Sequence, residues 1–150
     1  MTIKAFNKLK IYNALVTMIK KAILITKGEQ REQIKVNLYC LENNILMFAI
    51  PNGANKSRRA AMLFKAEGLK AGIPDCFIPM PKGIYAGLFI EMKDKPKVLQ
   101  SGKLSTSHTK VSPEQEQWLN ELMNQGYYAC VCYGSDEAIK VIDMYIKFKG

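Results

Sequence analysis

Residues 73–93 read IPDCFIPMPKGIYAGLFIEMK, in which two apolar runs flank the turn sequence PKG. Each run has the length and the aliphatic and aromatic content of a strand, and proline and glycine are residues that turns prefer. The stretch therefore predicts two strands, over 73–79 and 85–93, that pair as a hairpin in the centre of a sheet.

Further helices and strands are predicted on both sides of this hairpin. The order of elements is α, α, β, α, β, β, α, β, α, which predicts an α/β fold with one mixed four-stranded sheet flanked by helices. Residues 94–111 lack apolar periodicity and are expected to form a long exposed loop. The expected helices cover 2–27, 29–42, 57–67, 112–124 and 135–148, and the additional strands cover 45–50 and 127–133.

Length and charge limit the class of protein. The 150 residues suffice for one compact domain, which we place at 28–150 behind an N-terminal extension at 1–27. Lysine and arginine number 22 against 13 acidic residues, and the net charge of +9 favours a polyanionic partner such as nucleic acid. Attraction to anionic lipid, or solubility alone, would give the same balance. The uncharged run 11–19 is too short to cross a bilayer, so no membrane insertion is expected.

Residues 2–27 predict a basic amphipathic helix. The segment contains no acidic residue, and its lysines alternate with apolar residues at roughly helical spacing. We expect the helix to pack on the domain or on a partner subunit, with contact to a membrane surface or to DNA as alternatives. Its lysines are Lys4, Lys8, Lys10, Lys20, Lys21 and Lys27, and its apolar residues are Phe6, Ile11, Leu15, Met18 and Ile19.

The cysteines and the single histidine do not fit a zinc finger or a zinc ribbon. Cys40, Cys76, Cys130 and Cys132 form no CxxC pair, and His108 has no second histidine to complete a site. We expect reduced thiols, which are typical of the cytoplasm. His108 lies in the expected loop, and we assign it no role.

Three charged side chains concentrate in the central hairpin. Glu91 and Lys93 are two residues apart on one strand, so both side chains point to the same face of the sheet. Asp75 begins the neighbouring strand, and pairing across the turn can bring it beside Glu91. Two adjacent carboxylates repel each other, and a bound Mg²⁺ or Mn²⁺ would remove that penalty. The alternative is a surface ion pair between Glu91 and Lys93, with Asp75 fixing a turn.

Two longer stretches resemble a known nuclease family. FAIPNGANKSRRAAMLFKAEGLKAGIPDCFIPMPKGIYAGLFIEMK and SPEQEQWLNELMNQGYYACVCYGSDEAIKVI closely resemble the VRR-NUC family, virus-type replication-repair nucleases of the PD-(D/E)xK superfamily. The family features occur in order: a glutamate on an early helix, PNG, GxPD, GLFIExK, SPxQ, and GY before the last strand. The resemblance covers about 29–146 and implies a restriction-endonuclease-like PD-(D/E)xK core.

The resemblance also implies roles for individual residues. Asp75 and Glu91 would bind Mg²⁺ or Mn²⁺ together with the backbone carbonyl of Met92. Lys93 would act beside them in the hydrolysis of a phosphodiester by water, and Gln115 would support the site.

Two positions leave alternatives open. Glu29 matches the early acidic residue of the family, near which a second ion could sit. Glu32 is the alternative for that role. Gln115 also forms an SxxQ capping box with Ser112, which would stabilise the start of a helix without any catalytic role. Both readings of Gln115 are compatible.

Basic residues outside this site are candidates for phosphate contacts. Those that follow the PNG turn and those in the 94–111 loop could reach DNA, with a solvated basic surface as the alternative. They are Lys56, Arg58, Arg59, Lys95, Lys97, Lys103 and Lys110. A P-loop is not predicted, because Asn55 stands where that motif needs glycine. The interval from Lys93 to Ser112 is longer than the resemblance leads us to expect.

These observations predict a metal-dependent, structure-selective DNA endonuclease of viral or bacterial origin. Standalone viral members of the family resemble homodimeric resolvases of four-way (Holliday) junctions, and a two-fold dimer supplies the two matched cuts that a junction needs. One alternative is a nuclease of the same family that acts on flaps, ends or plain duplex. Another is a basic nucleic-acid-binding module whose carboxylates are structural.

Overall fold

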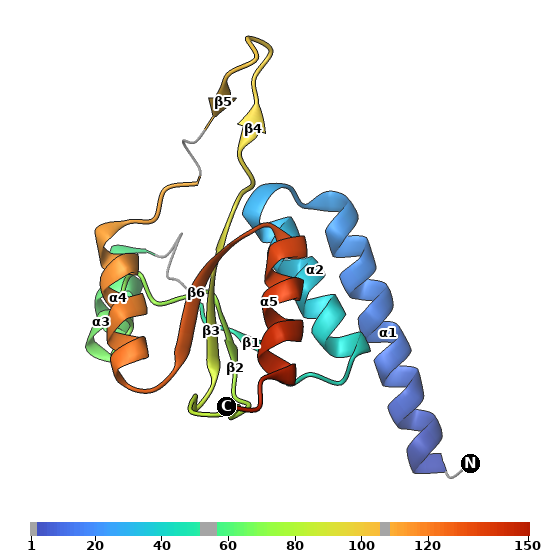
Figure 1. Ribbon diagram of the computed structural model, residues 1–150. Helices are drawn as coiled ribbons and strands as arrows, with labels where there is room; N and C mark the ends of the chain where they lie inside the picture. Colours follow the sequence, from blue (N-terminus) through green and yellow to red (C-terminus); the bar gives the residue numbers. More distant parts are fainter. Residues whose placement is uncertain (1–2, 52–56, 106–108) are drawn as a thin grey trace.

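The computed structural model describes residues 3–51, 57–105 and 109–150, with side chains from residue 8 onward. Apart from one additional hairpin, the helices and strands follow the predicted order, and the α/β class is confirmed (Figure 1). The elements are α1 (Ile3–Ile25), α2 (Gly28–Glu42), β1 (Phe48–Ala49), α3 (Arg58–Ala66), β2 (Cys76–Ile78), β3 (Leu88–Lys93), β4 (Lys97–Val98), β5 (Leu104–Ser105), α4 (Pro113–Asn124), β6 (Tyr128–Tyr133) and α5 (Ser135–Lys147).

Four strands form one mixed sheet in the order β1-β2-β3-β6. The first three pair antiparallel, and β6 lies parallel to β3. The parallel pair is possible because the long connection through α4 carries the chain back to the start of the sheet. Both the predicted hairpin of β2 and β3 and the predicted mixed four-stranded sheet are confirmed.

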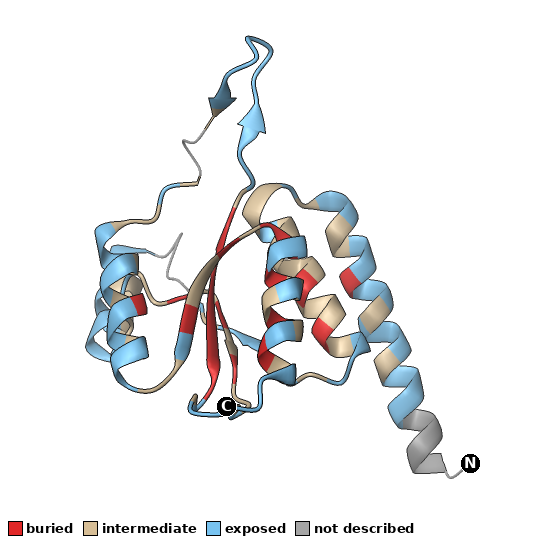
Figure 2. Cartoon of the chain, viewed as in Figure 1, coloured by how far each residue is buried: buried red, intermediate tan, exposed pale blue. Residues whose placement is uncertain are grey.

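The side chains of the central strand β3 alternate between two cores, as the two-residue period of a strand requires. The larger core lies between the sheet and helices α2 and α5, and the smaller one lies between the sheet and α4 (Figure 2). Leu88, Ile90 and Met92 belong to the larger core, and Phe89 belongs to the smaller one. Because all six residues of β3 are buried, polar groups on this strand are removed from water as well.

Helix α1 lies against α2 as an outer layer (Figure 1). The Nε of Arg31 donates to the carbonyl oxygen of Ile23 at 2.9 Å, and the Lys20 ammonium lies 3.4 Å from the Glu42 carboxylate. The predicted helix is present. Within the described part of the chain, no helix, α1 included, is long and apolar enough to cross a bilayer.

The apolar face predicted for α1 is wrong. Among its members with described side chains, Ile19 alone is buried, and the exposed ones are Ile11, Leu15 and Met18. The side chains of Lys4 and Phe6 lie outside the described set. The covered stripe instead consists of Tyr12, Val16, Ile19 and Ile23. Apolar residues occur nearly all round this helix, so only its contact with α2 decides which stripe is covered.

The segment expected to be a loop is exposed, but it contains a two-stranded hairpin. β4 and β5 pair antiparallel, with Lys97 opposite Ser105 and Val98 opposite Leu104. The connection includes Gly102 with a φ of 76°, in the left-handed region that favours glycine. Strands of two residues are too short for a periodic pattern to reveal.

All four cysteines are free thiols, as predicted. Burial raises the pKa of Cys40 to about 11 and that of Cys76 to about 12. Both thiols therefore stay protonated, and unreactive, near neutral pH.

Candidate active site

Asp75, Glu91 and Lys93 meet at one end of the sheet. Because Cys76 pairs with Ile90, the antiparallel register brings Asp75 opposite Glu91, and opposed residues share a face of the sheet. The Oδ2 of Asp75 accepts a hydrogen bond of 2.9 Å from the backbone N–H of Met92. The two carboxylates thus lie together, as the sequence predicted.

The carboxylate of Glu91 is buried, with only 1% of the residue exposed. Its Oε1 lies 3.0 Å from the Lys93 ammonium and accepts a hydrogen bond from the side-chain amide of Gln115. Its Oε2 is buried and has no hydrogen-bond partner among the described residues. A carboxylate oxygen that is removed from water without a partner is costly, so a ligand at this atom would stabilise the site.

Burial and neighbouring charges favour the protonated form of Glu91. Burial, followed by the negative charge of Asp75, raises the pKa of Glu91 to about 7. Lys93 opposes this rise, and Glu29 adds to it. The Lys93 side chain is only 10% exposed, so the alternative of a surface ion pair is wrong.

Gln115 makes both of the contacts considered for it. Its backbone N–H donates to Oγ of Ser112 at 3.3 Å, and its side-chain oxygen accepts from the backbone N–H of Ser112 at 2.9 Å. This capping box begins α4. The side-chain nitrogen of the same amide donates to Glu91. Because the amide has one accepting and one donating end, the cap and the contact with Glu91 do not compete.

The first turns of α4 lie close to the segment that leads to Asp75 and β2. The indole N–H of Trp118 donates to the carbonyl oxygen of Ala71 at 2.9 Å. Gly72 has a φ of 83°, and a Cβ there would lie 2.8 Å from the carbonyl carbon of Glu114 and 3.0 Å from the backbone nitrogen of Gln115. Glycine therefore permits the close approach that brings Gln115 to Glu91.

The donors around Glu91 suit a hard divalent cation. Two carboxylates and the peptide of Met92 offer oxygen ligands of the kind that Mg²⁺ and Mn²⁺ prefer, and the unpartnered Oε2 is one of them. No three His, Cys, Asp or Glu side chains within residues 8–51, 57–105 and 109–150 gather as a complete metal site. Asp75 and Glu91 would thus fill only part of a coordination shell, which fits Mg²⁺ because this ion usually keeps several waters.

The sequence matches the model of the VRR-NUC domain over residues 19–136. The chain belongs to the VRR-NUC family. A solved structure described as a VRR_NUC domain protein is 27% identical, with a TM-score of 0.64, and the match covers 83% of this chain and 92% of that one. No curated protein gives a significant match. Membership of VRR-NUC confirms the resemblance and makes this chain a domain of a nuclease family, with nucleic acid as its substrate class.

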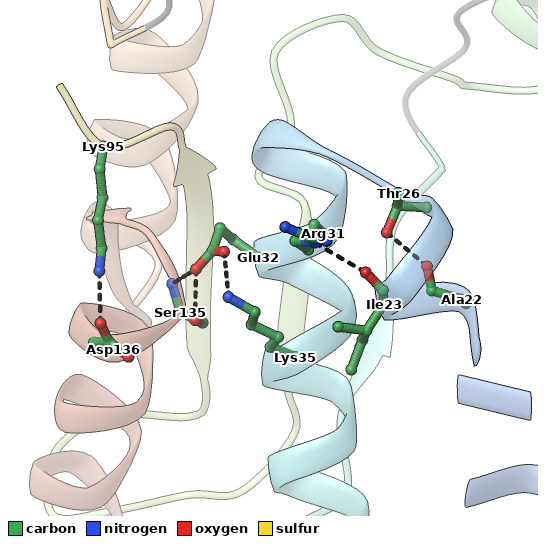
Figure 3. A network of polar contacts seen from close by, with 9 residues as sticks. All are labelled: Ala22, Ile23, Thr26, Arg31, Glu32, Lys35, Lys95, Ser135 and Asp136. Atoms are coloured by element: carbon green, nitrogen blue, oxygen red, sulfur yellow. Dashed lines mark hydrogen bonds and ion pairs between the residues drawn. The ribbon is translucent and has the colours of Figure 1, made fainter. Parts of the chain in front are cut away.

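Of the two acidic residues considered in the first turns of α2, Glu32 is engaged in holding the fold (Figure 3). Its Oε2 accepts hydrogen bonds from the backbone N–H and the hydroxyl of Ser135, at 2.8 and 2.5 Å, and its Oε1 lies 2.6 Å from Lys35. Glu29, by contrast, acts electrostatically on Glu91. Glu32 therefore holds the start of α5, whereas the negative charge of Glu29 adds to the rise in the pKa of Glu91.

Arg58 and Arg59 begin α3 and are exposed. Positive charge in the first turn of a helix opposes the helix dipole, so helix stability does not explain these two residues. Lys56 and His108 lie outside the described residues.

The lysines of the hairpin segment differ in their surroundings. The Lys95 ammonium lies 2.5 Å from Asp136, and the Lys97 ammonium lies 3.5 Å from Asp94. Lys103 is exposed near the tip of the hairpin, and Lys110 is exposed further along the chain. Lys95 is thus paired at the base of the hairpin, whereas Lys103 stands near its tip.

Two positions near the site were not foreseen as contributors to its geometry. Gly72 belongs to the GxPD signal, but its contact with α4 depends on the packing of a distant helix. The side chain of Asp94, which follows β3, lies beside the first residue of α2. A Cβ added to Gly28 would be 3.2 Å from Oδ2 of Asp94. Lys27 precedes this helix and provides no side-chain cap for it. The negative charge of Asp94 near the helix start is favourable, because it complements the helix dipole.

Glu32→Gln is expected to lower the free energy of unfolding by about 1–3 kcal/mol, because it weakens charge-assisted hydrogen bonds. Burial alone would raise the pKa of Glu32, but hydrogen bonds from Lys35 and Ser135 hold it at about 2, below the ordinary 4.5. This stabilisation is therefore present above about pH 4.5 and is lost as the pH falls towards 2. Urea denaturation at neutral and acidic pH measures both effects. Glu42→Gln, at an exposed ion pair, is the control, and equal losses in the two variants would contradict the assignment.

Gly72→Ala is expected to lower stability by about 1–3 kcal/mol, through backbone strain and through a clash with the start of α4. Gly68→Ala is the matched control, because Gly68 has a φ of 105° but no atom within 4 Å of an added Cβ. Thermal denaturation of the two variants separates the clash from the strain. Equal destabilisation would show that the contact with α4 contributes nothing.

In EDTA, Glu91 is expected to make the metal-free protein less stable as the pH rises from about 4.5 to about 7. The raised pKa means that the folded state keeps this proton to a higher pH than the unfolded chain does. Glu91→Gln cannot ionise and should lack this contribution. Denaturation of both proteins across this pH range measures the difference, and parallel curves would refute the raised pKa.

Proposed function

We propose that this VRR-NUC domain is a metal-dependent endonuclease with a PD-(D/E)xK active site that hydrolyses DNA phosphodiesters. One observation carries the proposal: Oε1 of Glu91 is held by Lys93 and Gln115, while its buried Oε2 has no partner among the described residues. A carboxylate with a structural role would have both oxygens satisfied. An open oxygen beside a second carboxylate, that of Asp75, is an arrangement that a cation would stabilise.

Asp75, Glu91 and the carbonyl of Met92 would hold Mg²⁺ or Mn²⁺, with Glu29 as a candidate ligand for a second ion. A bound divalent cation supplies positive charge that polarises a phosphate and eases the ionisation of water near neutral pH. The N–H of Met92 donates to Asp75, which keeps this peptide beside the carboxylate. These ligands come from adjacent strands, whose pairing fixes their relative positions.

Lys93 would orient the attacking water and offset the negative charge that builds up on the phosphate. Its ammonium lies 3.0 Å from Glu91 on a side chain that is mostly buried, so it is held within the site. Gln115 would act as a positioning residue, because its amide holds the oxygen of Glu91 that Lys93 also contacts. Lys93 and Gln115 together leave the other oxygen of Glu91 for the cation.

Branched DNA is the proposed substrate, and a homodimer that resolves four-way junctions is the proposed form. The net charge of +9 favours a polyanion, and the exposed arginines at the start of α3 would reach phosphates. A two-fold dimer would present two sites at a fixed separation to the two strands that must be cut. The proposed nuclease domain is 28–150, with 1–27 as its extension. The proposed DNA contacts are Lys56, Arg58, Arg59, Lys95, Lys97 and Lys103.

Glu91→Gln and Lys93→Ala are each expected to reduce Mg²⁺- or Mn²⁺-dependent cleavage of four-way junctions by about a hundredfold or more. The first removes the charge that holds the cation, and the second removes the ammonium beside it. Rates of cleavage of labelled junctions, flaps and plain duplex measure the effect and the preference together. EDTA should abolish cleavage by the wild type.

Glu121→Gln and Lys140→Ala are the matched controls, because they make comparable changes at exposed positions of α4 and α5. Both should cleave at the rate of the wild type. Metal-dependent cleavage that survives Glu91→Gln would contradict the proposed site. Equal cleavage of junctions and duplex, or a monomer by size exclusion that still cleaves junctions, would remove the resolvase assignment and leave a nuclease of other preference.

A further inference from the structure

The β4–β5 hairpin stands apart from the rest of the domain. Figure 2 shows it as an exposed ribbon beyond the end of the sheet, with no described element packed on either side. An isolated two-stranded hairpin is only marginally stable in water, because neither face is covered. Apolar side chains on such a hairpin therefore need an explanation other than packing within the domain.

The two faces of the hairpin differ in composition, and the lysines lie on one of them. Val98 and Leu104 are directly opposed across the strands, so their side chains share a face, and they are 72% and 63% exposed. Lys97 is opposed to Ser105 and points to the other face. The same alternation places Lys103 on that face, together with Leu99, which is 49% exposed and whose N–H donates to the carbonyl oxygen of Lys103. The face of Val98 and Leu104 thus carries no lysine, and both lysines lie on the other face beside Leu99.

The base of the hairpin is fixed relative to the active site. β4 begins four residues after Lys93, on the same segment that leaves the sheet. Lys95 pairs with Asp136 at the start of α5, and a Cβ on Gly134 would collide with the Lys95 side chain. The base of the hairpin is therefore tied to the start of α5, and the hairpin leaves the sheet directly after the strand that carries Glu91 and Lys93.

We propose that this hairpin is a wedge that recognises the branch point of a DNA substrate. Val98 and Leu104 cover base surface that is unstacked at the branch, and Lys97 and Lys103 contact the adjoining phosphates. The inference rests on the proposed function, which it deepens by naming the structural element that distinguishes branched from continuous DNA.

The energetics favour a branch over continuous duplex. Proteins that insert apolar side chains between stacked base pairs must first disrupt the stack, which costs a few kcal/mol per step. At a branch, stacking is interrupted, so apolar side chains can cover base surface without that full cost. Exposed Val98 and Leu104 would therefore add affinity for branched DNA and almost none for plain duplex.

DNA fits this hairpin better than a second copy of the chain or another protein does. A second copy of the hairpin offers no negative charge to Lys97 and Lys103, because residues 97–105 contain no acidic residue. DNA offers negative charge next to apolar base faces. Two aliphatic side chains also cover far less than the ~800 Å² per partner of a stable protein interface. A small apolar face bordered by lysines suits intercalation at a branch.

The double variant Val98→Thr and Leu104→Thr tests the wedge, because threonine retains strand propensity while replacing the apolar surface. Binding is measured in EDTA by fluorescence anisotropy, with a four-way junction and a duplex of the same length and sequence. The variant should bind the junction about tenfold more weakly, with its affinity for the duplex changed less than about twofold. A 2-aminopurine placed beside the branch should change its emission on binding of the wild type and respond less to the variant.

Two control variants separate the apolar effect from general loss of binding. Ile84→Thr with Met144→Thr makes the same type of change at residues that are 79% and 65% exposed and lie away from the hairpin, and it should alter neither affinity. Lys103→Gln should weaken junction and duplex binding equally and reduce the slope of log affinity against log salt by about 0.9. Thermal denaturation confirms that each variant is folded.

The outcomes separate the wedge from the nuclease assignment. Equal loss of junction and duplex affinity in the double threonine variant, or no junction preference in the wild type, would overturn the wedge whatever the cleavage assay shows. A wild type that binds junctions selectively through this face but cleaves nothing with Mg²⁺ or Mn²⁺ would support the wedge and overturn the proposed catalysis. A change of oligomeric state in the double variant by light scattering would identify the face as a contact between copies and overturn the wedge.

Discussion

The burial of one carboxylate constrains the whole site. Glu91 lies on the central strand of the sheet, between neighbours on both sides, where water cannot solvate its charge. Lys93 and Gln115 contact one oxygen of its carboxylate through an ion pair and a hydrogen bond. The other oxygen has no hydrogen-bond partner among the described residues. Removing an anion from water in this way is unfavourable unless a further positive group completes the arrangement. The proposed cation would complete this arrangement, which is the physical basis of the proposed catalytic activity.

Several elements of the fold serve to keep this carboxylate in place. The pairing of β2 with β3 brings Asp75 opposite Glu91, and Gly72 lets the start of α4 approach closely enough for Gln115 to reach it. The same Gln115 amide caps α4, so the stability of the helix and the position of the site depend on one side chain. Glu32 performs a separate task in joining α2 to α5. Stability and site geometry are thus closely linked around β3.

The described surface is less regular than the interior. Helix α1 carries exposed apolar residues outside its contact with α2, and the β4–β5 hairpin extends beyond the sheet with exposed aliphatic side chains and lysines. Both features lie outside the two cores that hold the sheet and its helices. Substitutions in these two features are expected to leave the packing around Glu91 intact, because their side chains do not contribute to either core.

Much of this protein is determined by its sequence alone. The period of β3 places Glu91 and Lys93 on one face, the turn at PKG predicts the hairpin, and the order of elements predicts the sheet, because these depend on neighbours a few residues apart. Tertiary structure decided the rest. Only the register of β2 against β3 shows that Asp75 faces Glu91, and only the contact with Ser135 separates Glu32 from Glu29. The covered stripe of α1 and the contact of Gln115 with Glu91 likewise depend on residues that are distant in the chain, and local periodicity carries no information about such contacts.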